Sequence, residues 1–460
     1  MVQEDHRIVI DSDGVSEEAG QYVNQLNEMF ARIGNQARTH LLVFIHGGLT
    51  SLSAANEAAK SLVPKIDGAD PNTYAIFVNW DSDLFSSYGR HLFYERNGIS
   101  YKGTPSSSVA FALFPLVLLS DFGRGIANFS MNTALNIGKL VENVDWAYQP
   151  NPRAFPTKNK FFETLREFTC NPDASQSADN FFHEGIKYIP RSHKPAINLF
   201  LGPDYRHQKP GLLASNTGTI PLQFATEPLL DSIGTSAWKN MLRRTRTMFY
   251  PAGNFITVSG VQQHQNLYPG AAYAFFERLD TFLRDHPSYT LDIIGYSMGA
   301  IIVNEALRNF PKIRIRNLVY MGAACSIRDF IVVGGPYLEH STSTQFYNLC
   351  LHPRAELDEA NVGGVPVRGS LLTWIDEFFQ TPESFGDRTL GTFENAVIAY
   401  KLLPQTNQIH LKAFGMNENQ FGKGYSAGPQ KHGEFCNFEF WNPRYWRTDV
   451  PLDTSYRLLQ

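Results

Sequence analysis

The chain combines 460 residues with a formal net charge of -4, 43% hydrophobic residues and 18% charged residues. This composition is typical of a folded globular protein and excludes wholesale disorder. The slightly acidic balance offers no broad basic field for a phosphate backbone, so we expect no nucleic-acid partner. The short basic run at residues 243–246 is typical of a solvated helix face.

The cysteines and the N-terminus limit the class of protein further. The four cysteines lie far apart without any C-x-x-C spacing, which predicts neither a zinc site nor a disulfide framework. Residues 1–14 carry acidic side chains where a secretory signal has a basic region and an apolar stretch. We therefore expect synthesis in the cytoplasm without signal cleavage, with export by a non-classical route left open.

Apolar runs alternate with a helical pattern in the first 80 residues. The runs at 41–45 and 74–80 predict strands, and the Ala-rich stretch 51–62 between them predicts a helix. This order is typical of a βαβ unit, in which the two strands are parallel.

The same alternation resumes after about residue 270. The pattern predicts helices at 271–286 and 298–310 and strands at 291–295, 317–324, 345–351 and 408–414. Residues 81–260 between the two parts are rich in Pro, Gly, Asn, Ser and aromatic residues and contain no repeat. We therefore predict an α/β fold in which a large cap or lid insertion, residues 81–260, divides a core formed by residues 1–80 and 261–460.

The most apolar segment, VAFALFPLVLL, covers residues 109–119. It is too short to span a bilayer, which takes about 20 residues. Two interpretations stay open: a helix buried in the core of the insertion, or a lid whose apolar face meets lipid.

The strongest local signal is the pentapeptide Gly295-Tyr296-Ser297-Met298-Gly299. It follows an apolar strand and precedes a helical pattern, which is the context in which G-x-S-x-G forms a sharp turn. Its small residues let the strand and the helix pack closely, and the helix N-terminus favours developing negative charge. Ser297 is therefore the predicted nucleophile.

A second motif, His46-Gly47-Gly48, directly follows the first predicted strand. Glycine is needed where the backbone approaches a substrate this closely. The backbone N–H groups of Gly48 and Met298 are predicted to form an oxyanion hole. A simple strand-ending turn is the alternative, but it gives no reason for the two motifs to occur in this order.

With both motifs, residues 41–80 and 270–440 resemble the α/β-hydrolase superfamily, in particular its serine esterases and lipases. The resemblance covers roughly half of the chain. It implies a mostly parallel central sheet with helices on both faces, and a catalytic triad in the chain order Ser, acid, His.

Four histidines follow Ser297 in the sequence. His410 lies within an alternating strand, His340 lies in a polar stretch, and His352 ends a strand. His432 follows the last predicted strand after a Gly-rich loop. The resemblance implies a histidine in a late loop, so His432 is the predicted general base.

Several carboxylates lie just beyond the strand at 345–351, where the resemblance implies the acid of the triad. Glu356 is the first candidate and Asp358 is the second, since either could orient the imidazole if the loop curls back. Asp376 and Asp387 are less favoured because they fall in or after a helix-like run.

These residues predict acyl transfer to water. His432 takes the proton of Ser297, the alkoxide attacks an ester carbonyl, and water releases the acyl-enzyme. No metal or organic cofactor is expected. The aromatic content of 13% and the apolar segment favour a lipid or another apolar acyl ester as the small-molecule substrate, with peripheral contact to a lipid interface.

Two alternatives belong to other classes of function. A lipase-type antibacterial toxin effector would use the same chemistry but would need an immunity partner and a delivery route. A catalytically inactive interaction module would keep the fold alone, and the intact Ser297 and His432 argue against it. The sequence does not predict the oligomeric state.

Overall fold

The chain divides into two compact units. The first comprises residues 1–123 and 232–318, and the second comprises residues 124–231 and 319–460. The computed structural model describes residues 6–10, 19–48, 50–83, 87–88, 92, 95–96, 99–100, 116–121, 198–201, 220–252, 255–258, 261–265, 269–359, 361–362, 365–366, 369–380, 385–400, 408–415 and 428–446.

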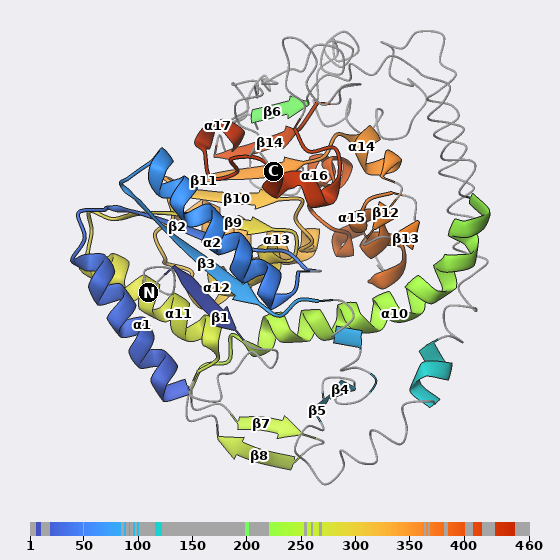
Figure 1. The fold of residues 1–460 in the computed structure, drawn as a ribbon, viewed down its shortest axis with the longest axis horizontal. Coiled ribbons are helices and arrows are strands. Elements are labelled where there is room, and N and C mark those ends of the chain that lie inside the picture. The colour runs from blue at the N-terminus through green and yellow to red at the C-terminus, as the bar shows by residue number, and fades with distance from the viewer. Residues whose placement is uncertain are drawn as a thin grey trace. The chain divides into compact units, whose positions relative to one another are not determined.

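The sheet of the first unit has the strand order β1-β3-β2-β9 (Figure 1), and every neighbouring pair is parallel. The strands are β1 (Arg7–Ile10), β2 (His40–Ile45), β3 (Thr73–Trp80) and β9 (Thr290–Tyr296). All residues of β3 and all of β2 except His40 are buried. Continuous buried runs of this kind are expected where helices cover both faces of a parallel sheet.

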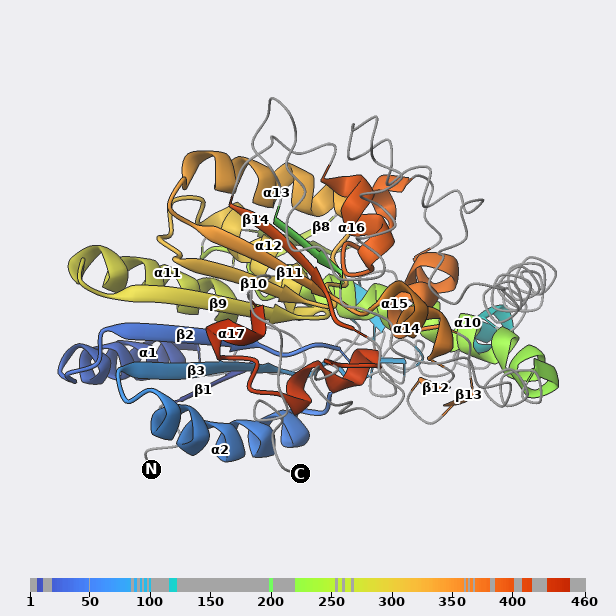
Figure 2. The ribbon, with the colours of Figure 1, turned by 90° about the horizontal axis from the view of Figure 1, so that it is seen from above.

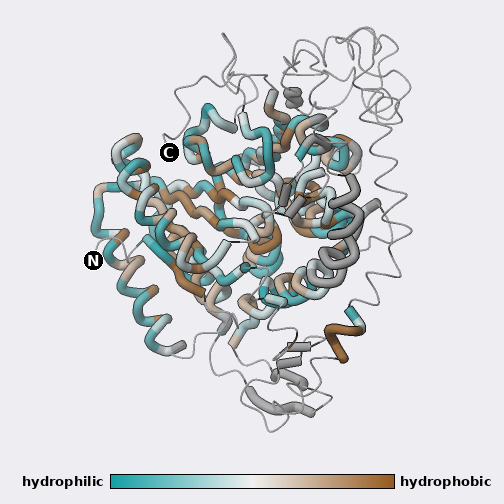
Figure 3. Tube along the Cα trace, turned by 45° about the vertical axis from the view of Figure 1, so that its right-hand side comes forward, coloured by the Kyte–Doolittle hydropathy of each residue, from teal (hydrophilic) through white to brown (hydrophobic). Residues whose placement is uncertain are grey.

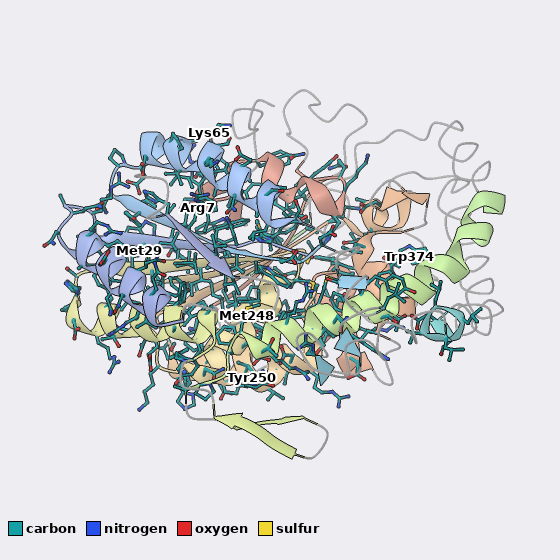
Figure 4. The ribbon with its side chains drawn as sticks, turned by 60° about the horizontal axis from the view of Figure 1, so that its bottom comes forward. Arg7, Met29, Lys65, Met248, Tyr250 and Trp374 are labelled. Carbon is teal, nitrogen blue, oxygen red and sulfur yellow. The ribbon has the colours of Figure 1, made fainter. Side chains whose placement is uncertain are left out.

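Four helices pack around this sheet: α1 (Ala19–Gly34), α2 (Leu52–Ala69), α11 (Ala271–Asp285) and α12 (Gly299–Asn309). Figure 2 shows α2 on one side of β2 and β3, with α11 and α12 on the other side. The Ser51 hydroxyl begins α2 by accepting a hydrogen bond from the Ala54 N–H (3.3 Å). Lys65 lies on the exposed face of α2, whereas Met29 of α1 is buried (Figure 4).

Helix α10 (Ile220–Thr247) contributes its residues from 232 onward to the first unit, and Met248 lies just beyond its end (Figure 4). The basic run within it is a solvated face only in part. Arg246 is exposed and Arg243 is half-buried, but the sequence prediction is wrong for Arg244. Arg244 is buried, and its Nη1 donates to the carbonyl of Asp81 (2.9 Å) and to the hydroxyl of Ser87 (3.2 Å). Hydrogen-bond acceptors in the segment after β3 explain this burial, because a buried guanidinium needs such partners.

The apolar segment at 109–119 is described from residue 116 onward, and residues 109–115 lie outside the described residues. Residues 116–121 form a short helix that is largely hydrophobic (Figure 3). Leu116 and Leu119 are 63% and 68% exposed, so permanent burial does not describe these two leucines. The helix is held by buried Asp121, which accepts hydrogen bonds from the Tyr88 hydroxyl and the Ser236 hydroxyl (both 3.2 Å).

Two antiparallel hairpins complete the described elements of the first unit. One pairs β4 (Glu95–Arg96) with β5 (Ile99–Ser100), and the other pairs β7 (Phe255–Val258) with β8 (Val261–Gln265).

The strands of the second unit follow the order β10-β11-β14-β6, and β11, β14 and β6 are parallel. They are β10 (Asn317–Met321), which begins at the boundary between the units, β11 (Gln345–Cys350), β14 (Ile409–Ala413) and β6 (Asn198–Leu201). The remaining elements are α13 (Ile327–His340), α14 (Pro353–Asp358), the hairpin of β12 (Asn361–Val362) and β13 (Val365–Pro366), α15 (Leu371–Trp374), the π-helix η2 (Ile375–Phe379), the 3₁₀ helix η3 (Phe385–Asp387), α16 (Phe393–Ala399), the 3₁₀ helix η4 (His432–Asn437) and α17 (Pro443–Trp446).

The predicted α/β class is confirmed, because both units contain parallel strands with helices packed against them. The compact units follow boundaries other than the predicted 1–80, 81–260 and 261–460, and most of the proposed insertion lies outside the described residues. Cys325 and Cys350 are buried free thiols. Within the described part of the chain, no helix has both the length and the apolar character that crossing a membrane requires.

Candidate active site

Strand β2 stands where the strand order of the first unit reverses. Strand β3 lies on one side of β2 and β9 lies on the other. The connections after β2 and β9 lead to α2 and α12 on opposite faces of the sheet (Figure 2). Such a reversal opens a crevice at the carboxyl ends of the strands, the usual ligand position in α/β sheets. Both predicted motifs, residues 46–48 and 295–299, lie at this edge.

Ser297 is the only non-glycine residue among those described that has a positive φ, at 53°. A conformation of this kind costs on the order of 1–3 kcal/mol and persists only where the surrounding structure imposes it. Here the first turn of α12 begins directly at the serine, since the Ala300 N–H donates to the Ser297 carbonyl (3.2 Å). The strained strand-turn-helix geometry that the G-x-S-x-G motif predicts is therefore present.

Two glycines allow this turn to pack against the end of β2. A Cβ on Gly299 would overlap the carbonyl oxygen of Ile45, and a Cβ on Gly47 would lie 2.7 Å from the Cβ of Ser297. Real Cβ atoms do not come this close to other atoms, so both positions exclude any side chain. The turn at Ser297 and the loop after β2 are in backbone contact.

The two predicted oxyanion donors also belong to neighbouring segments. A Cβ on Gly48 would lie 2.8 Å from the Sδ of Met298 and 3.9 Å from the Sδ of Met241 on α10. The structure thus brings Gly48, Met298 and Ser297 together at one edge of the first unit. Thioether sulfur atoms next to this backbone make the surroundings of the loop apolar.

His46 fixes the start of the loop rather than serving as a base. Its Nε2 accepts a hydrogen bond from the Trp80 N–H (3.1 Å), and its Nδ1 lies 2.8 Å from the carbonyl oxygen of Gly47. Because Nε2 accepts, the ring proton resides on Nδ1 and is donated to Gly47. Burial lowers the pKa of His46 to about 4, so the ring is neutral at pH 7.

In the second unit, His432 begins the 3₁₀ helix η4 and is buried. Its backbone N–H donates to Glu359 Oε2 (2.9 Å). Its imidazole packs against Gly322, which follows β10, and against the ring of Phe435. Burial lowers the pKa of His432 to about 4, which keeps the imidazole in the neutral form that can accept a proton.

The carboxylate that contacts His432 belongs to Glu359, which the sequence analysis did not choose. Glu359 is buried directly after α14, and its N–H donates to the Ala355 carbonyl (3.1 Å). Burial raises the pKa of Glu359 to about 7, although the hydrogen bond from the His432 N–H and the nearby Lys431 lower it in part. Glu359 is therefore a third candidate for the acid of the triad.

The two predicted acids lie on α14, Glu356 one turn of helix before Glu359 and Asp358 directly before it. Glu356 is buried, and its backbone carbonyl accepts from the Ser370 N–H (2.8 Å). Burial raises the pKa of Glu356 to about 8, and nearby carboxyl groups raise it further while Ser370 lowers it in part. Glu356 thus holds a proton at pH 7. The side chain of Asp358 lies outside the described residues.

Asp376 has a structural role in the second unit. Its carboxylate accepts hydrogen bonds from the Thr389 N–H (2.6 Å) and from the Asn395 amide (2.8 Å), which join η2 both to the segment before α16 and to α16 itself. Burial raises the pKa of Asp376 to about 7, although these hydrogen bonds lower it in part. Asp387 forms an exposed ion pair with Arg328 (3.0 Å).

The other late histidines occupy positions that differ from that of His432. His340 ends α13 on the surface, with its Nδ1 2.6 Å from the Pro336 carbonyl. His410 is half-buried on β14, where it stacks on Tyr347 and contacts Gln345. His352 is fully buried directly after β11.

Three residues of the site region were not predicted from the sequence: Glu359, Gly322 and the buried Ser82. Glu359 follows Glu356 by three residues, and helical spacing places both on one face, so the sequence alone could not rank them. Gly322 and Ser82 each follow a strand at its carboxyl end. That position was the available signal, because site residues of parallel α/β sheets gather there.

No protein-family model, curated protein or solved structure matches this chain. Its chemistry therefore has to be argued from its own residues. Among the described residues, no group of three or more His, Cys, Asp or Glu side chains has an arrangement that could hold a metal ion.

Two glycines beside His432 provide a test of how tightly its imidazole is held. Gly322 has a φ of 51°, and a Cβ there would lie 2.9 Å from the His432 Cε1, whereas a Cβ on Gly433 would meet nothing within 4 Å. We expect Gly322→Ala to lower the free energy of unfolding by about 2 kcal/mol, through backbone strain and displacement of the ring. Gly433→Ala should change it by less than about 0.5 kcal/mol.

The measurement is urea unfolding of both variants, together with the NMR resonances of the His432 ring. The ring resonances should shift in Gly322→Ala and stay in place in Gly433→Ala. Equal stability and unchanged ring resonances in Gly322→Ala would contradict the described packing of His432.

Proposed function

We propose that this chain is a serine hydrolase that cleaves carboxylic esters through an acyl-enzyme on Ser297. The observation that carries the proposal is the positive φ of Ser297 at the carboxyl end of the parallel strand β9, in backbone contact with the loop that holds Gly47 and Gly48. Strain of this kind costs free energy and clusters at functional sites. A structural turn at residues 296–299 would not require a serine in that conformation.

In the proposed reaction, His432 removes the proton of the Ser297 hydroxyl as the oxygen attacks the ester carbonyl. The N–H groups of Gly48 and Met298 stabilise the oxyanion of the tetrahedral intermediate. The protonated His432 then gives its proton to the leaving alcohol, and water repeats the sequence to release the acid. The neutral state of His432 supports its role as the base that begins the cycle.

We assign the orienting acid to Glu359, with Glu356 as the alternative. Glu359 accepts a hydrogen bond from the His432 backbone, so its carboxylate already lies beside the residue that it would orient. The hydrogen bond from the His432 N–H and the nearby Lys431 both act to lower the pKa of Glu359, which also favours Glu359 as the ionised partner. An ionised carboxylate is what stabilises the imidazolium in such triads.

The substrate that we propose is a lipid or another ester with an apolar acyl chain. The sulfur atoms of Met241 and Met298 near Gly48 support an apolar acyl site. Leu116 and Leu119, exposed on a helix that is held through Asp121, support contact with a lipid interface. The proposed reaction needs no metal or organic cofactor. The toxin effector and the catalytically inactive interaction module are the two alternative proposals.

The first test of this proposal is covalent labelling. A fluorophosphonate should react with Ser297, and Ser297→Ala should abolish both labelling and ester hydrolysis, because loss of the nucleophile removes the covalent route. Peptide mapping after digestion locates the adduct, and circular dichroism checks that the variant is folded. An adduct on another residue would contradict the assignment of Ser297, and an unreactive wild type would favour the interaction module.

The second test separates the two acids. Glu359→Gln should lower kcat by about 10²- to 10⁴-fold, because an amide cannot stabilise the imidazolium. Glu356→Gln should keep most of the activity, since the amide replaces a carboxyl group that is already protonated at pH 7. Steady-state kinetics on a soluble nitrophenyl ester at pH 7 make the comparison, and the reverse ranking would assign the acid to Glu356.

The free energy of unfolding, measured as a function of pH, tests the protonated state of Glu356. Its pKa lies near 8 in the folded protein and near 4.5 ordinarily, so the stability that it contributes is fully present below pH 4.5 and is lost as the pH rises through about 8. Glu356→Gln should remove that loss, so its advantage in the free energy of unfolding over wild type should grow between pH 5 and pH 9. An advantage that does not change with pH would contradict the protonated state of Glu356.

A further inference from the structure

Ser82 lies two residues beyond β3, is fully buried, and reaches the loop after β2 with its side chain. Its Oγ is 3.0 Å from the carbonyl oxygen of Gly47 and 3.0 Å from that of Thr50. A serine hydroxyl carries one proton, so the two carbonyl groups share it. The hydroxyl therefore connects the segment after β3 to both ends of residues 47–50.

We propose that Ser82 is a positioning residue that aims the Gly48 N–H at the oxyanion. The inference rests on the proposed function and adds a residue to it that touches neither the substrate nor Ser297. It depends on the geometry of one peptide unit, the one that joins Gly47 to Gly48.

The Gly47 carbonyl and the Gly48 N–H belong to the same planar peptide unit. In a trans peptide these two groups point in opposite directions, and the described residues contain no cis peptide bond. Any interaction that fixes the direction of the Gly47 carbonyl thus fixes the direction of the Gly48 N–H. Ser82 Oγ and His46 Nδ1 both hold that carbonyl, at 3.0 Å and 2.8 Å.

The two glycines make it necessary to fix the direction of this peptide unit by other contacts. Gly47 and Gly48 have no Cβ, so their backbone torsions have more freedom than those of other residues. A side chain cannot restrict Gly47, because a Cβ there would lie 2.7 Å from the Cβ of Ser297, and a Cβ at Gly48 would displace the Met298 side chain. Hydrogen bonds to the carbonyl are the remaining way to hold the peptide plane between these two residues.

The segment that carries Ser82 is itself held from two directions. On one side, the Trp80 N–H donates to His46 Nε2 and the Trp80 indole donates to the His46 carbonyl (3.2 Å). On the other side, buried Arg244 on α10 donates to the carbonyl of Asp81. Ser82 therefore acts from a rigid position, which an oxyanion donor requires because it must be in place before charge develops.

The test compares Ser82→Ala with wild type and with a control, Thr73→Val. Thr73 is also a buried hydroxyl residue of the first unit, but it begins β3 at the amino end of the strand, and its hydroxyl donates to Asp70 (2.6 Å). Ser82→Ala should lower kcat about 10- to 100-fold with KM changed less than about 2-fold, as expected for an interaction realised in the transition state. Thr73→Val should keep kcat within about 2-fold of wild type.

The Ki of a trifluoromethyl ketone provides a second readout. General loosening of the protein would not change this Ki in proportion to kcat. The adduct of the ketone with the nucleophile is tetrahedral and carries an oxyanion, so its Ki should rise in Ser82→Ala by the same factor by which kcat falls. Thermal unfolding of all three proteins accompanies the kinetics, and Ser82→Thr, which keeps the hydroxyl, should restore at least part of kcat.

Three outcomes would overturn the inference. Unchanged kcat and Ki in Ser82→Ala would show that Gly48 needs no help from Ser82. An equal loss in Thr73→Val would show that any lost buried hydrogen bond has the same effect. A wild-type protein that neither hydrolyses esters nor reacts at Ser297 would remove the proposed function and this inference with it, a result distinguishable from the first two because wild type itself is inactive.

Discussion

Backbone contact between the turn at Ser297 and the loop after β2 is the constraint on which the candidate site depends. Ser297 has a positive φ in the turn where β9 passes into α12 within two residues, and Gly47 and Gly299 leave no room for side chains at this contact. The free-energy cost of the strained serine has to be offset by the rest of the unit, whose fully buried β3 and nearly buried β2 provide the apolar packing. In the proposed reaction, the strained turn presents the Ser297 hydroxyl at the end of β9 as the nucleophile.

In the second unit, the main feature is a set of ionisable groups whose pKa values are shifted by burial. Burial holds His432 neutral at pH 7 and favours the protonated forms of Glu356, Glu359 and Asp376. Environments that separate the pKa values of neighbouring groups are how proteins assign acid and base roles near neutral pH. Asp376 is saturated with hydrogen bonds from Thr389 and Asn395, so its function is structural, whereas Glu359 contacts the histidine that the proposed reaction uses.

Local sequence patterns were sufficient to predict the strands and helices that carry the candidate site. Strands β2, β3 and β9 and helices α11 and α12 lie within about one residue of where apolar periodicity predicted them. Helix α2 was predicted for residues 51–62 but continues to Ala69, beyond Pro64. The sequence could not predict which acid meets His432, since Glu356 and Glu359 share a helix face and only tertiary packing distinguishes them. It also gave no sign that Arg244 is buried, because the hydrogen-bond acceptors that allow this burial come from a segment about 160 residues away.

The account's central claim is that Ser297 becomes acylated during turnover. Acid quenching within milliseconds of mixing the protein with excess nitrophenyl ester, followed by mass spectrometry of the Ser297 peptide, measures this directly. The account predicts a burst of nitrophenol together with a mass increase equal to one acyl group on Ser297, and neither should occur in Ser297→Ala. Hydrolysis that proceeds without any acyl adduct, or with the adduct on another residue, would contradict it.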